Sequence, residues 1–226
     1  PTASVSVVYN EKGEVQDILT FKRNPDLILI DTEIIVQAPE RFLVSGMGDA
    51  LSTWVEAQAC KKNHRNNVEG HLGTLTAYSI AELCYSTILE YGYPAKLSNE
   101  AKVATPAFEN VVEANTLMSG IGFESGGLAG SHAIHNGFCV LPETSAYYHG
   151  EKVAFGMLAS LFLTDKPQYI VEELYSFCEK VGLPTTMKEI GVTDTSKETL
   201  MKVARRSCRE DECIFNDLLN VTSEQV

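Results

Sequence analysis

The hydrophobic pattern of this 226-residue chain changes near residue 40, and that change constrains the fold more than any other feature. Before it, β-branched runs over residues 4–9 and 15–22 flank a polar turn that contains Gly13, which predicts a β-hairpin. The run 27–30 predicts a third strand. After it, apolar residues recur at the spacing of amphipathic helices. The sequence therefore predicts a mainly α chain, with a strand-bearing segment over 1–38 and an all-helical domain over 39–226.

Seven helices are predicted in the second part from apolar periodicity and from residues typical of helix ends. Gly92, Gly120 and Gly182 are expected to close three of them, and Ser98-Asn99 is expected to start another. The predicted helices cover residues 49–60, 74–91, 99–119, 125–140, 150–164, 167–181 and 195–208.

Composition excludes several classes of protein. Lys and Arg number 18 against 30 Asp and Glu, so the formal charge of −12 disfavours binding to a phosphate backbone. No apolar run approaches the roughly 20 residues that span a membrane. The six cysteines form no CxxC motif, and Cys60, Cys84 and Cys178 lie within helix-like stretches. We expect free, buried thiols in a reducing compartment, hence a cytoplasmic protein with neither nucleic-acid nor membrane partners.

Three of the five histidines have a spacing that suggests a shared site. His64 and His71 lie in a polar stretch and are expected to be exposed. His132 and His135 are three residues apart and so share one face of a predicted helix. His149 begins the next predicted helix, after a turn near a proline. An antiparallel pair of helices would bring these rings to the same end of the bundle.

Asp49 has two possible roles. It follows two glycines at a predicted helix start, where it could cap the helix by accepting backbone N–H groups. It could instead join two of the histidines as a metal ligand. One carboxylate and two imidazoles leave a coordination position open, as in catalytic sites for divalent metals. The residues alone leave both roles open.

Several segments resemble the iron-containing alcohol dehydrogenase superfamily, and most closely its glycerol dehydrogenase branch. The resemblance runs in order along nearly the whole chain. It implies the C-terminal helical-bundle domain of the dehydroquinate synthase-like fold, preceded by strands left from an N-terminal α/β domain. The chain is therefore expected to be a piece of a longer protein. The matching segments are 1–9, 27–33, 46–56, 81–85, 126–137 and 149–154.

The resemblance also implies roles for individual residues. It places the metal ligands on Asp49, His132 and His149. Members that use iron carry a fourth ligand, a histidine four residues after the aspartate, where this chain has Thr53. The metal implied is therefore zinc.

Substrate and cofactor positions are implied in the same way. Phe123 and His135 match positions near the substrate, although a phenylalanine after a glycine is also a common core residue. Ala3, Val5 and Val7 match positions that line the nicotinamide pocket, although alternate residues of a half-buried strand would look the same.

The activity implied is oxidation of glycerol, or a related vicinal diol, to dihydroxyacetone, with zinc and NAD as cofactors, in a homo-oligomer such as the octamer common in the family. The string Gly120-Ile-Gly122 lacks the third glycine of a dinucleotide-binding turn and follows a helix instead of a strand. The 226 residues by themselves are thus expected to bind metal without oxidising glycerol.

Two alternatives remain. A lyase like dehydroquinate synthase, or a glycerol-1-phosphate dehydrogenase, would need several cations to hold a phosphate. Only Lys152 lies near the predicted site, and Arg205, Arg206 and Arg209, beside the acidic run 210–212, are expected to form a solvated face. The second alternative is a non-catalytic helical assembly module, which would have no need for Asp49.

Overall fold

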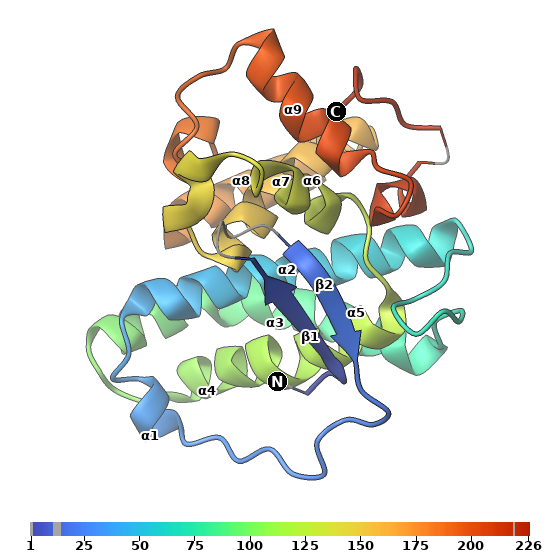
Figure 1. The fold of residues 1–226 in the computed structure, drawn as a ribbon. Helices are drawn as coiled ribbons and strands as arrows, with labels where there is room; N and C mark the ends of the chain where they lie inside the picture. The colour runs from blue at the N-terminus through green and yellow to red at the C-terminus, as the bar shows by residue number, and fades with distance from the viewer. Residues whose placement is uncertain (1, 11–14, 219) are drawn as a thin grey trace.

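The computed structural model describes residues 2–10, 15–218 and 220–226, and within them the chain is mainly helical, as predicted (Figure 1). A two-stranded sheet precedes the helices, and short 3-10 and π turns connect some of them. The elements in order are β1 (Val5–Tyr9), β2 (Val15–Thr20), α1 (Thr32–Ile35), α2 (Glu40–Lys62), α3 (Leu75–Glu100), α4 (Pro106–Glu113), the π-helix η1 (Ala114–Met118), α5 (Ser119–Gly126), α6 (Gly130–Phe138), the 3-10 turn η2 (Pro142–Ala146), α7 (His149–Leu163), α8 (Gln168–Val181), η3 (Met187–Ile190), α9 (Lys197–Ser207) and η4 (Cys213–Asn216).

The predicted hairpin forms. Strands β1 and β2 pair antiparallel with Val7 opposite Ile18. The hairpin is joined to the helices, because the Ser4 N–H donates to Glu124 of α5 at 2.8 Å and the Thr2 hydroxyl donates to the Thr116 carbonyl at 3.0 Å. In Figure 1 the two strands are seen in front of the middle of the helical bundle.

The predicted third strand at 27–30 is wrong, because these residues have no regular structure. Leu27 and Leu29 are 82% and 90% exposed. A strand needs a neighbouring strand to accept and donate its backbone hydrogen bonds. Within the described residues the only sheet is the β1–β2 pair, so the apolar run meets no partner.

Several predicted helix boundaries are also wrong. Helix α2 begins at Glu40, well before residue 49, and α3 runs through Gly92 and Pro94 to Glu100, so Ser98-Asn99 ends a helix instead of starting one. Gly92 lies against the ring of Phe177, and this packing holds the helix where its propensity is low. Gly120 lies inside α5, and the helix predicted over 125–140 is confined to Gly130–Phe138.

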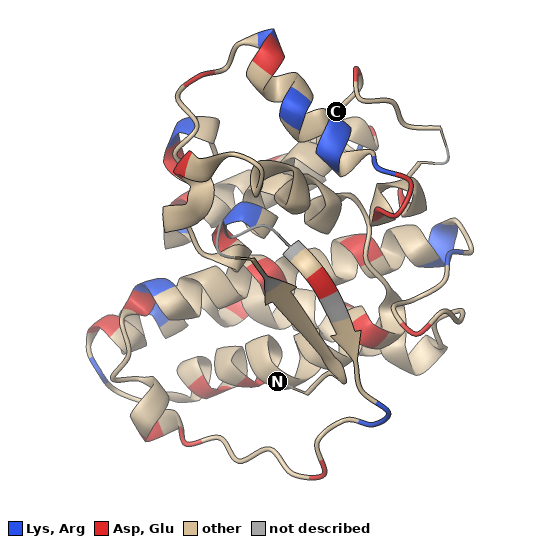
Figure 2. Ribbon diagram, in the orientation of Figure 1, with Lys and Arg blue, Asp and Glu red and all other residues tan. Residues whose placement is uncertain are grey.

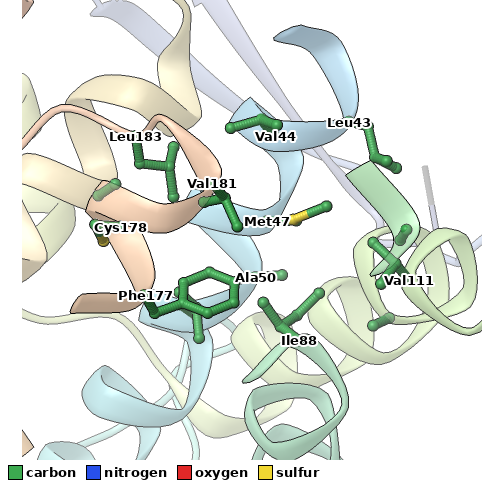
Figure 3. Close-up of a cluster of buried hydrophobic side chains, with 14 of the residues drawn as sticks. Leu43, Val44, Met47, Ala50, Ile88, Val111, Phe177, Cys178, Val181 and Leu183 are labelled. Carbon is green, nitrogen blue, oxygen red and sulfur yellow. The ribbon is translucent and has the colours of Figure 1, made fainter. Parts of the chain in front are cut away.

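Helix α2 is the centre of the bundle. Its residues Met47 and Ala50 are fully buried and pack with Ile88 of α3 and Phe177 of α8 (Figure 3). A second apolar cluster joins α6, α7 and α9 through residues such as Phe138. Helices α6 and α7 return antiparallel around the turn at Pro142–Ala146, as the histidine spacing predicts.

The state of the cysteines and the distribution of surface charge agree with the expectations from the sequence. All six cysteines are free, and Cys60, Cys84 and Cys178 are buried, as predicted. Lys and Arg positions are scattered over separate elements among more numerous acidic ones (Figure 2). Among the described helices, none combines the length and apolar character needed to cross a bilayer.

Candidate metal centre

Three helices bring Asp49, His132 and His149 together. One carboxylate oxygen of Asp49, on α2, lies 3.4 Å from Nε2 of His132, on α6, and 3.5 Å from Nε2 of His149, the first residue of α7. The possible ligand atoms of all three lie within 4.8 Å of one another. The spacing predicts that His132 and His149 meet, and these are the three residues that the resemblance implies as metal ligands; their binding of a metal stays a prediction.

The capping role considered for Asp49 is wrong. Asp49 lies in the interior of α2, where the backbone N–H groups are already bonded within the helix. Burial acts to raise the pKa of Asp49, but His149 and His132 outweigh it and hold the pKa well below its usual range. The carboxylate is therefore ionised and directed at two imidazoles, an arrangement that could hold a metal ion.

Glycines beside two of these residues let the helix backbones touch. A Cβ on Gly48 would lie 2.5 Å from the carbonyl oxygen of Gly150, and a Cβ on Gly150 would lie 1.9 Å from the carbonyl oxygen of Ser45. Real Cβ atoms cannot approach so closely. Gly48 precedes Asp49 and Gly150 follows His149, so this contact of α2 with α7 sets the separation of the two side chains.

Glu56 orients His132, a role that the sequence analysis missed. Its side chain is 1% exposed, and one carboxylate oxygen lies 2.6 Å from Nδ1 of His132. The carboxylate accepts the Nδ1 proton, so Nε2 is the nitrogen that faces Asp49 and that would bind a metal in place of a proton. A signal existed, because Glu56 lies two helical turns after Asp49 on the same face of α2.

The electrostatics around His132 favour a positive charge at this site. Burial acts to lower the pKa of His132, but the Glu56 and Asp49 carboxylates outweigh it and raise the pKa to about 10. The buried carboxylate of Glu56 and the half-buried carboxylate of Asp49 thus favour a positive charge between them. A divalent cation can supply that charge in place of the proton, which is the usual competition at metal sites.

Helix α6 begins without a cap from its own sequence, and two distant acids replace it. Ala129, at the N-cap position, offers no side-chain hydrogen bond. Its N–H donates to Glu56 at 2.8 Å, and the Gly130 N–H donates to Asp217 at 2.7 Å. The N–H of His132 also donates to Glu56, at 3.0 Å. The first turn of α6 is thereby fixed by α2 and by the C-terminal segment.

Asp217 should make stability depend on pH. Burial raises the pKa of Asp217 to about 7, and Glu56 adds to the rise. The folded state then keeps a proton that the unfolded state releases near pH 4. Because of this group, the free energy of unfolding of the protein decreases as pH rises from about 4 to 7. Asp217→Asn, whose amide oxygen still accepts from Gly130, should be stabilised relative to the parent at pH 8, on the order of 3 kcal/mol.

Urea unfolding of the metal-free parent and variant at pH 5 and pH 8 checks this expectation. The gap in unfolding free energy between them should widen toward pH 8. A gap that is equal at both pH values would show that the Asp217 carboxyl has an ordinary pKa.

His135 stands behind His149. It is 1% exposed, and its Nε2 lies 3.1 Å from Nδ1 of His149. Burial lowers the pKa of His135 well below its usual value, with His149 and Lys152 adding to the effect. A neutral His135 can accept the Nδ1 proton of His149, which leaves Nε2 of His149 free to face Asp49.

Thr53 contributes no ligand. Its hydroxyl lies 3.0 Å from the hydroxyl of Ser119 on α5, and its side chain is buried there. The position that would carry a fourth ligand in an iron site thus takes part in helix packing, which is consistent with a three-ligand centre.

A cavity of about 460 Å³ opens beside the histidines. His132, His135 and His149 line it, together with Val7 of β1 and the segment around Glu212. Val7 is thus on the cavity wall, and its role in binding the cofactor stays a prediction.

The other expected site residues lie elsewhere. Ala3 and Val5 are half-buried and are not among the residues that line the cavity, and the same is true of Phe123 on α5. Their roles in binding cofactor or substrate stay predictions.

The solvated face expected for residues 205–212 is partly wrong. Arg209 pairs with Asp211 on the surface at 3.1 Å. Arg206 instead forms an ion pair with Glu212 in which the side chains are only 17% and 7% exposed. The pair is covered because the C-terminal segment folds back over the start of α6, where Asn216 donates to the Leu128 carbonyl at 2.8 Å.

Comparison with known proteins agrees with this architecture. The chain is 59% identical over all of its 226 residues to a glycerol dehydrogenase of Thermotoga maritima, and it spans 62% of that protein's length. A crystal structure of glycerol dehydrogenase from Schizosaccharomyces pombe, 45% identical, superimposes with a TM-score of 0.95 over 99% of this chain and 57% of that one. A scan against protein-family models finds no match.

The fold extends to more distant proteins. An iron-containing alcohol dehydrogenase from Thermococcus thioreducens, 18% identical, superimposes with a TM-score of 0.73 over 99% of this chain and 58% of that one. The chain thus has the C-terminal helical domain of this fold and is homologous over its full length to glycerol dehydrogenases, which confirms the resemblance seen in the sequence.

Proposed function

We propose that the protein to which this chain belongs oxidises glycerol, or a related vicinal diol, with NAD⁺, and that this chain supplies the metal and substrate side of the reaction. The observation that carries the proposal is homology to glycerol dehydrogenases along all 226 residues. The convergence of Asp49, His132 and His149 supports it, because a helical assembly module would not need a half-buried acid that faces two oriented imidazoles.

The donor set fits a zinc ion. Asp49, His132 and His149 offer one oxygen and two nitrogens, the ligand types of catalytic zinc sites with an open position. Glu56 and His135 accept the other ring protons of the two histidines, so both Nε2 atoms are available as ligands. When bound, zinc would supply Lewis-acid chemistry, which lowers the pKa of a coordinated substrate hydroxyl.

The residues of the chain then bind and orient the substrate. The cavity beside the histidines is large enough for a three-carbon diol, and Val7 gives it an apolar wall. In the overall reaction the secondary carbon of glycerol gives a hydride to NAD⁺, its hydroxyl proton is released, and dihydroxyacetone forms. We place Phe123 and His135 on the substrate side, and Ala3, Val5 and Val7 on the nicotinamide side.

The arginines of the cavity disfavour the alternative substrates. Arg206 and Arg209 line it, but each is neutralised by its own carboxylate, Glu212 and Asp211. Lys152 is 7% exposed and donates to the Cys139 thiol at 3.5 Å. A phosphorylated substrate, as in the lyase or a glycerol-1-phosphate dehydrogenase, would require cations free to bind it. A neutral polyol fits better.

Further parts of the proposal concern the protein as a whole. We propose an NAD-binding domain outside residues 1–226, with the boundary of the helical domain near residue 39. We also propose a homo-oligomer located in the cytoplasm.

The experiment that tests the proposal is an assay of NAD⁺ reduction with glycerol. The full-length protein should reduce NAD⁺ with glycerol, lose more than about 90% of the rate after treatment with a strong chelator, and recover it with zinc. A rate that is unchanged after the zinc has been removed would contradict the metal's role.

The 226 residues expressed alone should bind zinc but leave NAD⁺ unreduced, because they contain no dinucleotide-binding turn. A folding check by circular dichroism would accompany this assay. Steady glycerol-dependent NADH formation by the isolated chain would contradict the proposed division of labour.

A further inference from the structure

We propose that Glu212 is a positioning residue for the metal ligand His149, and that it acts through Asn136 and His135. The inference rests on the metal centre proposed above. Glu212 lies outside the helices that carry the ligands, between α9 and η4, yet a continuous series of hydrogen bonds joins it to His149.

Each step of the series is a close contact. Nδ1 of His149 lies 3.1 Å from Nε2 of His135, and Nδ1 of His135 lies 3.0 Å from the side-chain oxygen of Asn136. The amide nitrogen of Asn136 lies 3.1 and 3.3 Å from the two carboxylate oxygens of Glu212. Arg206 pairs with the same carboxylate.

Proton positions along the series follow from its two ends. Glu212 can only accept, so Asn136 donates its amide hydrogens to it and presents its carbonyl oxygen to His135. His135 must then donate from Nδ1, which leaves Nε2 as an acceptor. His149 donates from Nδ1 to that acceptor, so its Nε2, which faces Asp49 at 3.5 Å, is the nitrogen left to bind a metal. The series thereby selects the tautomer of His149 that can bind a metal.

Burial makes this selection strong. His135 is 1% exposed, and the side chains of Glu212 and Arg206 are 7% and 17% exposed. Water has little access to replace a lost partner, and a buried polar group without a partner is costly. The Arg206 guanidinium pairs with the same carboxylate, so hydrogen-bond donors approach Glu212 from both Arg206 and Asn136.

The two histidine ligands are supported differently. His132 donates directly to the Glu56 carboxylate, which both fixes the ring and makes it a stronger donor to a metal. His149 donates to a neutral imidazole, which accepts in the required direction only while Asn136 holds its other nitrogen as the donor. His149 therefore depends on a distant carboxylate that the sequence alone would assign to the surface.

The test is the zinc affinity of full-length protein carrying Glu212→Ala, Asn136→Ala or both, measured by competition with a chelating dye. Each single variant should bind zinc about tenfold more weakly than the parent, within the 10- to 100-fold range for outer-shell partners. The double variant should be no weaker than the single ones, because both break the same series. The visible absorption of bound Co²⁺ should change in the same variants.

Two further variants separate positioning from general damage. Glu212→Gln keeps an oxygen that can accept from Asn136 and should restore most of the affinity. Asn63→Ala removes the bonds of 2.8 Å that Asn63 donates to the carbonyls of Asn216 and Asp217, so it loosens the same C-terminal segment without touching the series. It should bind zinc like the parent.

The outcomes are decisive in each direction. Parent-like affinity and Co²⁺ spectra in Glu212→Ala and Asn136→Ala would overturn the positioning role while leaving the metal centre intact. Equal weakening by Asn63→Ala would also overturn it, because loosening of the segment would then explain the loss. A parent protein that binds no zinc would overturn the metal centre and this inference together.

Discussion

His132→Ala and His149→Ala should each abolish stoichiometric zinc binding. Either change removes one of three ligands and leaves Asp49 with a single imidazole partner. The loss of zinc affinity should exceed about 100-fold, the upper range for losing only an outer-shell partner. Elemental analysis of dialysed protein gives the measurement, with one zinc per chain expected for the parent and essentially none for either variant.

The chain offers matched controls for this experiment. His64 and His71 are exposed and are not among the residues of the cluster, so His64→Ala and His71→Ala should keep one zinc per chain. Zinc retained at full stoichiometry in His132→Ala and His149→Ala would mean that the metal binds elsewhere and would remove the assignment.

Gly150→Ala should destabilise the protein strongly, although the same change inside an ordinary helix stabilises it by up to about 1 kcal/mol. The added methyl would lie 1.9 Å from the Ser45 carbonyl oxygen, and a backbone atom in the middle of α2 cannot rotate away. We expect a loss of at least about 3 kcal/mol, at the upper end for overpacked cores. Zinc affinity should fall as well, because α7 must move away from α2 and carry His149 with it.

Urea unfolding and zinc titration of Gly150→Ala would show both effects, and Gly46→Ala is the control. Gly46 is also inside α2, but there the methyl would meet the amide end of Asn115, a side chain that can turn aside. Its unfolding free energy should stay within about 1 kcal/mol of the parent. Equal stability of Gly150→Ala and Gly46→Ala would show that α2 and α7 are not in backbone contact.

The sequence predicts those parts of the site that depend on local spacing. His132 and His149 are separated by one helix, a proline-containing turn and a helix start, and that length returns the second ring beside the first. The role of Asp49 is harder to predict from the sequence, because its glycine neighbours suggest a helix start. The glycines instead serve contact with α7, which no local pattern reveals.

The sequence could not predict the hydrogen-bond partners of the site that come from distant parts of the chain. Glu56 is 76 residues from His132, and Glu212 is 76 residues from Asn136. Charged residues are usually exposed, so both would be assigned to solvent without the fold. The opposite error occurs at 27–30, where an apolar run predicts a strand but has no neighbour to pair with.

The start of α6 has a consequence for how the site assembles. A nine-residue helix whose first N–H groups are satisfied by Glu56 and Asp217 has little reason to persist before those acids arrive. The amides of Ala129, Gly130 and His132 should therefore be protected from deuterium exchange as strongly as the bundle core, and this protection should appear only after α2 and the C-terminal segment have docked. Metal capture would then be a late event in folding, completed when α2 and the C-terminal segment have both docked against one short helix.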